Sequence, residues 1–153
     1  MLLFSTHITP RLRYIVDFVG SELFDEPIQI TTDIKTFAAA AGPRINYSDQ
    51  YIAGCFFIRP IPLLFESGVR AIEIECFPFR DQKAFFATQG DFPFDLFSAA
   101  FYLLTRYEEY LPHDKDEYGR YAHTNSLAWR EGFLDQPLVN GWLQEFKTVL
   151  SLY

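Results

Sequence analysis

The strongest hydrophobic pattern of the chain lies between Gly90 and Pro112 and predicts one long, mostly buried helix. Asp91 precedes the run as a plausible N-cap, and Pro93 suits the first helical turn, where its missing N–H needs no partner. At 100° per residue the polar side chains fall within an arc of about 100°, and apolar side chains fill most of the remaining circumference. We therefore predict a central helix that other elements cover on most sides. Its polar stripe consists of Asp95, Ser98, Tyr102, Thr105, Arg106 and Glu109.

The first part of the chain has the pattern of a strand, a helix and a second strand. Residues 2–6 form a short apolar run, and apolar residues then recur at helical spacing after Thr9 and Pro10. Residues 27–33 are rich in β-branched side chains, which is typical of a strand. Strand, helix and strand indicate a right-handed parallel unit. Its carboxyl edge, which carries the turn after the first strand and Asp33 after the second, is where open α/β sheets bind ligands.

The rest of the pattern completes an α/β fold. Residues 34–41 predict a short helix, and residues 52–60 form an apolar run typical of a buried strand. Residues 71–79 alternate between apolar and polar, and residues 83–88 are expected to pair with them as an antiparallel edge. Residues 136–153 predict a last helix with one apolar face. We expect one α/β domain over residues 1–153, with a mixed sheet of about five strands, helices on both faces and one central buried helix.

Composition and charge narrow the classes of function. Among the 153 residues, 49% are hydrophobic and 18% aromatic, so the core is expected to be aromatic and the chain globular. The formal net charge of -7 argues against a general binder of nucleic acid or of anionic membranes. Asp95 and Arg106 interrupt the longest apolar run, which is too short for a membrane span of about 20 residues.

Two cysteines and the first residues of the chain bear on its compartment. Cys55 and Cys76 both lie in apolar segments, and a disulfide framework or a four-ligand zinc site needs more than these two cysteines. Buried free thiols are therefore expected. The start MLLFSTHITPR has no basic region and too short an apolar stretch for a secretory signal, so the sequence predicts a cytoplasmic protein.

Candidate ligand-binding residues come from two regions. His7 and Arg11 flank the start of the first predicted helix, where a cation is unfavourable unless an anion is also present. The alternative is that Arg11 pairs with an acidic group such as Asp17. Arg106 and Glu109 end the polar stripe of the central helix, where paired charges can serve acid–base chemistry or simply form a solvated helix end. The candidate ligand-binding residues are His7, Arg11, Asp33, Arg106 and Glu109.

No motif for a common catalytic or metal site is present. No serine has the flanking glycines of a nucleophile elbow, and no glycine-rich loop is available to hold a phosphate. His113 and His123 lack a usual metal-ligand spacing, and the loop from Asp114 to Asn125 lacks the oxygen ligands of a calcium loop. The sequence therefore predicts no catalytic residue, no metal ligand and no cofactor in this segment.

Several short phrases of the chain carry a further signal when they are taken together: THITPRLRY, ITTD, RINYSD, IRP, LLFESG, FPFDLFSAAFYLLTRYEEYLP, GRY, NSLA and QPLVNGW. Their combination resembles the N-terminal domain of bacterial polysaccharide deacetylase-like proteins. The resemblance covers nearly the whole chain, and residues 94–110 are its most specific part. In that family a separate catalytic domain of the carbohydrate esterase type follows, in which an aspartate and two closely spaced histidines hold a divalent metal that activates water for amide hydrolysis.

These catalytic motifs do not occur here, so no catalytic residue carries over. The spacing of His7, His113 and His123 does not give the two-histidine pair, and ITTD lacks the paired aspartates. The last helix reaches Tyr153 without a C-cap glycine or a polar tail, and we expect the chain to be the N-terminal part of a longer protein. The resemblance implies an accessory domain that packs on its own C-terminal catalytic domain or contacts polysaccharide. The alternative is a small stand-alone anion-binding protein or hydrolase with a site at the carboxyl edge of the sheet.

Overall fold

The computed structural model describes all 153 residues and confirms an α/β fold. Helices are labelled α, 3-10 helices η and strands β. In chain order the elements are β1 (Leu2–Phe4), α1 (Pro10–Phe24), β2 (Gln29–Thr31), α2 (Ile34–Ala39), β3 (Arg44–Asn46), β4 (Phe56–Phe57), η1 (Pro62–Phe65), β5 (Phe77–Phe79), β6 (Gln82–Ala84), α3 (Leu96–Leu104), η2 (Tyr107–Tyr110), η3 (His123–Asn125), α4 (Leu127–Arg130) and α5 (Leu138–Leu150).

The main sheet has four parallel strands in the order β2-β1-β3-β4. The chain leaves β1 through α1 to reach β2 on one side, then returns past β1 through α2 to reach β3 on the other. This reversal of direction places a topological switch point between β1 and β3. The antiparallel strands β5 and β6 form a separate two-stranded sheet rather than an edge of the first one.

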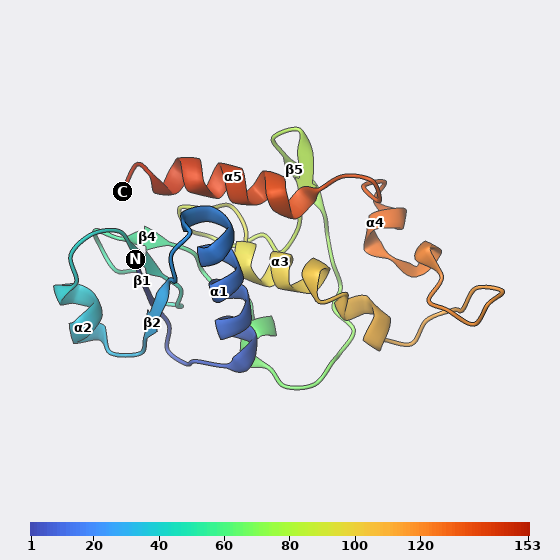
Figure 1. Ribbon diagram of the computed structural model, residues 1–153, viewed down its shortest axis with the longest axis horizontal. Coiled ribbons are helices and arrows are strands. Elements are labelled where there is room, and N and C mark those ends of the chain that lie inside the picture. The colour runs from blue at the N-terminus through green and yellow to red at the C-terminus, as the bar shows by residue number, and fades with distance from the viewer.

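Helices cover both faces of the main sheet, as expected. Successive side chains of a strand point to opposite faces, so Leu3 belongs to the main core while Phe4 packs against Phe37 of α2 in a smaller cluster. Thr9 caps α1 by accepting from Leu12 N, and Asp33 caps α2. Figure 1 shows α2 at one end of the molecule beside β2, and α1, α3 and α5 together at its centre.

The central buried helix is confirmed, but it is shorter than the sequence pattern predicts. Helix α3 begins after Asp95, whose side chain accepts from Ser98 N, and residues 96–102 are all buried. It ends at Leu104, because Arg106 has a left-handed backbone (φ 53°) and a 3-10 turn follows. Asp91 is not the cap.

Asp91 instead runs beside the end of β4. Its backbone N–H donates to Phe57 O, and its carboxylate accepts from Phe57 N at 2.8 Å. The approach is close enough that a Cβ on Gly90 would lie 2.6 Å from Phe57 O, which explains the glycine. Tertiary pairing with β4 therefore holds residues 90–91 outside the helix.

The last helix has the apolar face that its sequence predicts. Trp142 and Phe146 in α5 are fully buried, and Leu138 and Leu150 are nearly so. Phe146 packs its ring against rings from β4, from the loop before α3 and from α3 itself. None of the helices combines the length and the apolar character that crossing a lipid bilayer requires.

Candidate functional site

A cavity of about 270 Å³ opens at the carboxyl ends of β1 and β3. This is the topological switch point, where open parallel sheets bind their ligands, because the crossovers leave the sheet in opposite directions and a crevice remains between them. Half of the lining is polar and half is apolar. The lining residues are Thr6, His7, Ser48, Asp49, Pro60, Ile61, Pro62 and Phe65.

The turn after β1 supplies Thr6 and His7. Buried Ser5 fixes this turn by donating its hydroxyl to His7 O at 2.8 Å. The His7 ring lies with Nδ1 3.1 Å from Thr6 Oγ1 and packs edge-on against Phe65, with 6.3 Å between ring centroids. Both Thr6 and His7 are exposed, and both line the cavity.

The turn after β3 supplies Ser48 and Asp49. Asn46 and Ser48 are buried and bind each other, since the Ser48 hydroxyl donates to Asn46 Oδ1 at 2.6 Å. Asn46 Nδ2 also donates to Gln50 O at 2.6 Å, which closes the turn. The carboxylate of Asp49 is exposed and makes no hydrogen bond or ion pair within the chain, although Arg59 donates to its backbone oxygen at 3.1 Å. The backbone of Asp49 is therefore held, while its carboxylate is free to accept hydrogen bonds.

The third wall of the cavity is the segment from Pro60 through η1, and Asp95 anchors it from below. Asp95 is fully buried and accepts from Ile61 N at 2.8 Å, from Tyr47 OH at 2.8 Å and from Ser98 Oγ at 2.6 Å. Thus one carboxyl group joins the start of α3, the end of β3 and the wall of the cavity.

Burial dominates the electrostatics of this network. Removal from water raises the pKa of Asp95, and its hydrogen bonds from Ser98, Ile61 and Tyr47 offset this rise in part. Burial, and then the nearby Asp95 charge, raise the pKa of Tyr47 well above its usual value. Tyr47 therefore stays protonated and donates to Asp95.

Of His7 and Arg11, the two candidate residues near the start of α1, only His7 lines the cavity. The Arg11 guanidinium donates to Leu63 O at 3.0 Å and to Gly68 O. It also lies over the rings of Phe101 and Tyr107, 5.6 and 5.8 Å from their centroids. Carbonyl oxygens and ring faces satisfy this charge, so its position at a helix start does not require a bound anion.

The other predicted residues have contacts of their own. Asp33 accepts from Lys35 N and Thr36 N as the cap of α2, and its hydrogen bonds, foremost that from the Thr36 hydroxyl, lower its pKa. Arg106 and Glu109 form an ion pair with each other just after α3. The structure thus brings Arg106 together with Glu109, but it places neither of them, nor Arg11 or Asp33, in the lining of the cavity.

Among the residues that line the cavity, sequence reasoning predicted only His7, and it missed the polar residues Thr6, Ser48 and Asp49 as well as Asp95 beneath the wall. Ser48 and Asp49 follow β3 in the phrase NYSD, and the signal that could have found them is a polar pair directly after a buried strand. Asp95 was visible as the first polar position of the central helix, three residues before Ser98, which is the spacing of an N-cap and its donor.

A family model described as "Family of unknown function (DUF7033)" matches residues 1–152. The chain belongs to this family. No curated protein and no solved structure matches the chain. The DUF7033 description names no activity, so the candidate site rests on the geometry above, and the resemblance to polysaccharide deacetylase-like proteins stays a prediction.

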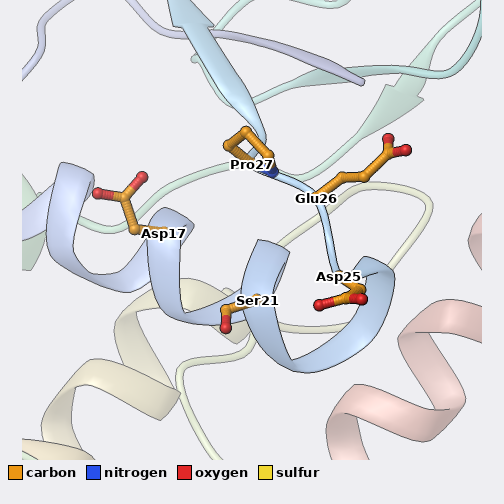
Figure 2. Close-up of a pocket in the computed structure, with 5 residues that line it drawn as sticks. All are labelled: Asp17, Ser21, Asp25, Glu26 and Pro27. Carbon is orange, nitrogen blue, oxygen red and sulfur yellow. The ribbon is translucent and has the colours of Figure 1, made fainter.

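A second hollow in this DUF7033 chain is acidic and lies between α1 and the turn that leads to β2. It measures about 430 Å³ and is lined by Asp17, Ser21, Asp25, Glu26 and Pro27. Figure 2 shows the three carboxylates spread around the hollow rather than turned toward one another. No group of three or more His, Cys, Asp and Glu side chains in the chain is arranged to hold a metal ion. We therefore treat the cavity between β1 and β3 as the candidate site.

Proposed function

We propose that this chain is a non-catalytic accessory domain of a polysaccharide deacetylase-like protein and that it contacts glycan through the cavity between β1 and β3. The observation that carries the proposal is the mixed lining of that cavity at the switch point of the sheet. The resemblance of the chain to the N-terminal domains of such proteins supports the choice of ligand class.

The lining suits a sugar because it combines hydroxyl-binding groups with an apolar wall. The free carboxylate of Asp49 accepts hydrogen bonds from sugar hydroxyls, and Thr6 and His7 add further polar atoms. Phe65 and the two prolines offer surface for the C–H face of a sugar ring. At about 270 Å³ the cavity is slightly smaller than the roughly 300 Å³ at which drug-sized ligand sites begin, which favours one sugar unit over a buried oligosaccharide.

The contacts of the polar residues favour binding over hydrolysis. A serine nucleophile needs a base within hydrogen-bond reach, but the Ser48 hydroxyl donates to Asn46 Oδ1 and His7 Nδ1 lies beside Thr6 Oγ1. The rival function, an anion-binding protein or hydrolase at this edge, requires Arg11 or Arg106 to converge with His7. The Arg11 guanidinium is held by carbonyl groups and that of Arg106 by Glu109.

The test is a titration of the chain, followed by ¹H–¹⁵N NMR, with oligosaccharides of N-acetylglucosamine and, separately, of glucosamine. We expect shift changes at residues that line the cavity. Asp49→Asn keeps the shape but removes the charge-assisted hydrogen bonds, so affinity should fall about 10-fold. Asp17→Asn, which removes an exposed carboxylate from the acidic hollow, is the matched control and should leave affinity unchanged.

Two results would contradict the proposal. If neither oligosaccharide shifts any cavity residue, the domain does not contact amino-sugar glycans through this site. Packing on the catalytic domain would then be the better explanation of the domain's role. It would require the cavity to be covered in the longer protein. If Asp17→Asn weakens binding as much as Asp49→Asn, the interaction is a general effect of negative charge.

A further inference from the structure

Residues 71–76, which lead into the hairpin of β5 and β6, have the pattern of a strand but no partner strand. We call this segment the arm. From Ala71 to Cys76 the residues alternate strictly between exposed and half-buried, and the chain then continues directly into β5. Ile72, Ile74 and Cys76 pack against the main core. This is the burial pattern of a strand with one face on a core. Figure 1 shows this stretch, in light green, as a thin line that leads into β5 with no strand drawn beside it.

The backbone of residues 71–76 makes no hydrogen bond within the chain. The last contacts before this arm are Arg70 N, which donates to Tyr107 OH at 2.9 Å, and Gly68 O, which accepts from Arg11. The next is the β5–β6 ladder, which starts at Phe77 opposite Ala84. Between these points neither a backbone N–H nor a carbonyl group has a partner in the protein.

The arm is unpaired because the segment that follows β6, which lies opposite to it in the hairpin, turns away. Phe86 has a positive φ of 63°, which bends the chain after β6. Ala87 then bridges to Phe94, and Thr88 N donates to Pro93 O, so these residues pair with the segment before α3. A hollow of about 470 Å³ lies between the arm and the segment after β6. Its lining residues are Glu73, Glu75 and Cys76 from the arm, Phe77 from the start of β5, and Phe86 and Ala87 from the segment after β6.

We propose that residues 71–76 form an open strand edge that accepts an extended basic segment of a partner protein by β-strand addition. A row of free N–H and C=O groups on an extended backbone is a template for one more strand, and main-chain hydrogen bonds then supply the affinity. Alternate side chains of the added strand would reach the hollow, where Phe77 and Phe86 favour an apolar residue.

The charge of the arm selects the partner. The carboxylates of Glu73 and Glu75 are exposed and form no ion pair within the chain, so lysine or arginine side chains of an added strand would complement them. A second copy of this chain would instead bring glutamates against glutamates, and each copy carries a net charge of -7. Like charges on paired strands are destabilising, which disfavours a dimer through this edge.

The experiment measures backbone hydrogen exchange of the 153-residue chain with and without a peptide of alternating lysine and valine, matched in length to the arm. In the free chain the amides of residues 71–76 should exchange fast, because none of them has an acceptor. At saturating peptide we expect protection that is confined to this arm. A peptide of alternating glutamate and valine should give no protection.

Three variants separate backbone pairing from charge. Glu75→Pro removes one exposed N–H donor, whereas Glu75→Ala removes the same side chain and keeps the donor. Affinity for the lysine peptide should fall about 10-fold further in the proline variant. The double reversal of Glu73→Lys with Glu75→Lys should weaken the lysine peptide by about 10-fold and create binding of the glutamate peptide.

A third measurement does not depend on how well any variant folds. A lysine–valine peptide in which every backbone nitrogen is methylated cannot donate from either edge and should lose binding. Unchanged binding of that peptide, no protection of residues 71–76 at saturation, or equal effects of Glu75→Pro and Glu75→Ala would overturn the proposal. Protection of the arm in the absence of peptide, accompanied by dimerisation, would identify a second copy as the occupant and would also overturn it. The arm shares no residue with the glycan cavity, so each proposal can fail without the other.

Discussion

A single buried carboxyl group, that of Asp95, holds three parts of the molecule in place. It caps α3 through Ser98 N at 3.1 Å, receives the Tyr47 hydroxyl from the end of β3 and fixes the cavity wall through Ile61 N. Buried polar groups are costly unless every one is paired. Asp95 meets that condition because each of the groups around it is a donor and the carboxylate is purely an acceptor.

Exchange of this acceptor for an amide should therefore lower stability. In Asp95→Asn the amide can accept from Ser98 N or from Ile61 N, but its NH2 group then faces the other donor and leaves that N–H buried without a partner. We expect the free energy of unfolding, measured with urea, to fall by about 1–3 kcal/mol. Asp33→Asn is the matched control, because Asn and Asp cap helices equally well and Asp33 is exposed. Equal losses in both variants would show that capping, not the buried network, explains the effect.

The same carboxyl group makes a pH prediction with a definite sign. Burial raises the pKa of Asp95 in the folded chain above the ordinary value of 3.8. At a pH between the unfolded and the folded pKa, the folded chain holds a proton that the unfolded chain has released. This group's contribution to the free energy of unfolding therefore falls as the pH rises. The Asp95→Asn variant has no such proton. Its stability deficit relative to the natural chain, measured from about pH 4 to about pH 8, should therefore shrink as the pH rises. A deficit that grows with pH would show that the donors around Asp95 lower its pKa instead.

Among the elements, those with a local signal were predictable. Thr9 and Pro10 mark the start of α1, and the spacing of Leu138, Trp142, Phe146 and Leu150 marks the buried face of α5. The extent of α3 was not, because two candidate caps, Asp91 and Asp95, precede it. The choice between them depends on β4, which engages Asp91. That contact joins residues more than thirty positions apart, and no local pattern encodes it.

The hairpin also shows that a hydrophobic pattern along the chain does not predict which residues pair with another strand. Alternation correctly predicted that Ile72, Ile74 and Cys76 face the core, but it placed Phe77 on the opposite side, whereas Phe77 also packs against the core. It also could not predict that only Phe77 to Phe79 would find a partner strand. The bend at Phe86 decides this, and a bulky residue with a positive φ has no sequence signature.

The candidate site was predictable in location but not in composition. The carboxyl edge of the sheet and His7 followed from the first strand, helix and strand. Asp49 and Ser48 did not, because they join the site only if β3 lies beside β1, and strand order depends on the whole fold. Arg11 was selected for its place at a helix start, and only the tertiary contact with Leu63 O and Gly68 O shows how its charge is satisfied.

At the scale of the whole molecule, the sheet separates two apolar clusters of very different size. The main core comprises 32 buried residues, to which every α-helix except α2 contributes, whereas the cluster beneath α2 has three, Phe4, Phe37 and Cys55. The cavity opens at the edge of the sheet between these two layers, and its wall is tied to the main core through Asp95. Loss of the small cluster should therefore leave the site intact, while damage to the main core should not.

Two substitutions of the same kind test this asymmetry. Phe146 and Phe37 are both fully buried, but Phe146 contacts rings of Phe56, Phe92 and Phe97 in the main core, and Phe37 contacts the ring of Phe4 in the small cluster. Phe146→Ala should lower the free energy of unfolding by about 3–5 kcal/mol, since the surrounding core cannot close the cavity left behind. Phe37→Ala should cost less than about 3 kcal/mol, because α2 is short, lies on the outside of the sheet and can move to fill the space.

Urea unfolding gives the two free energies, and hydrogen exchange shows where each substitution acts. Phe37→Ala should speed exchange in α2 alone, whereas Phe146→Ala should speed it in α1, α3 and α5 together, because these three helices pack on one another. If Phe37→Ala costs as much as Phe146→Ala and speeds exchange throughout the molecule, the two faces of the sheet unfold as one cooperative unit. The wall of the cavity would then depend on α2 as strongly as it depends on the buried carboxyl group of Asp95.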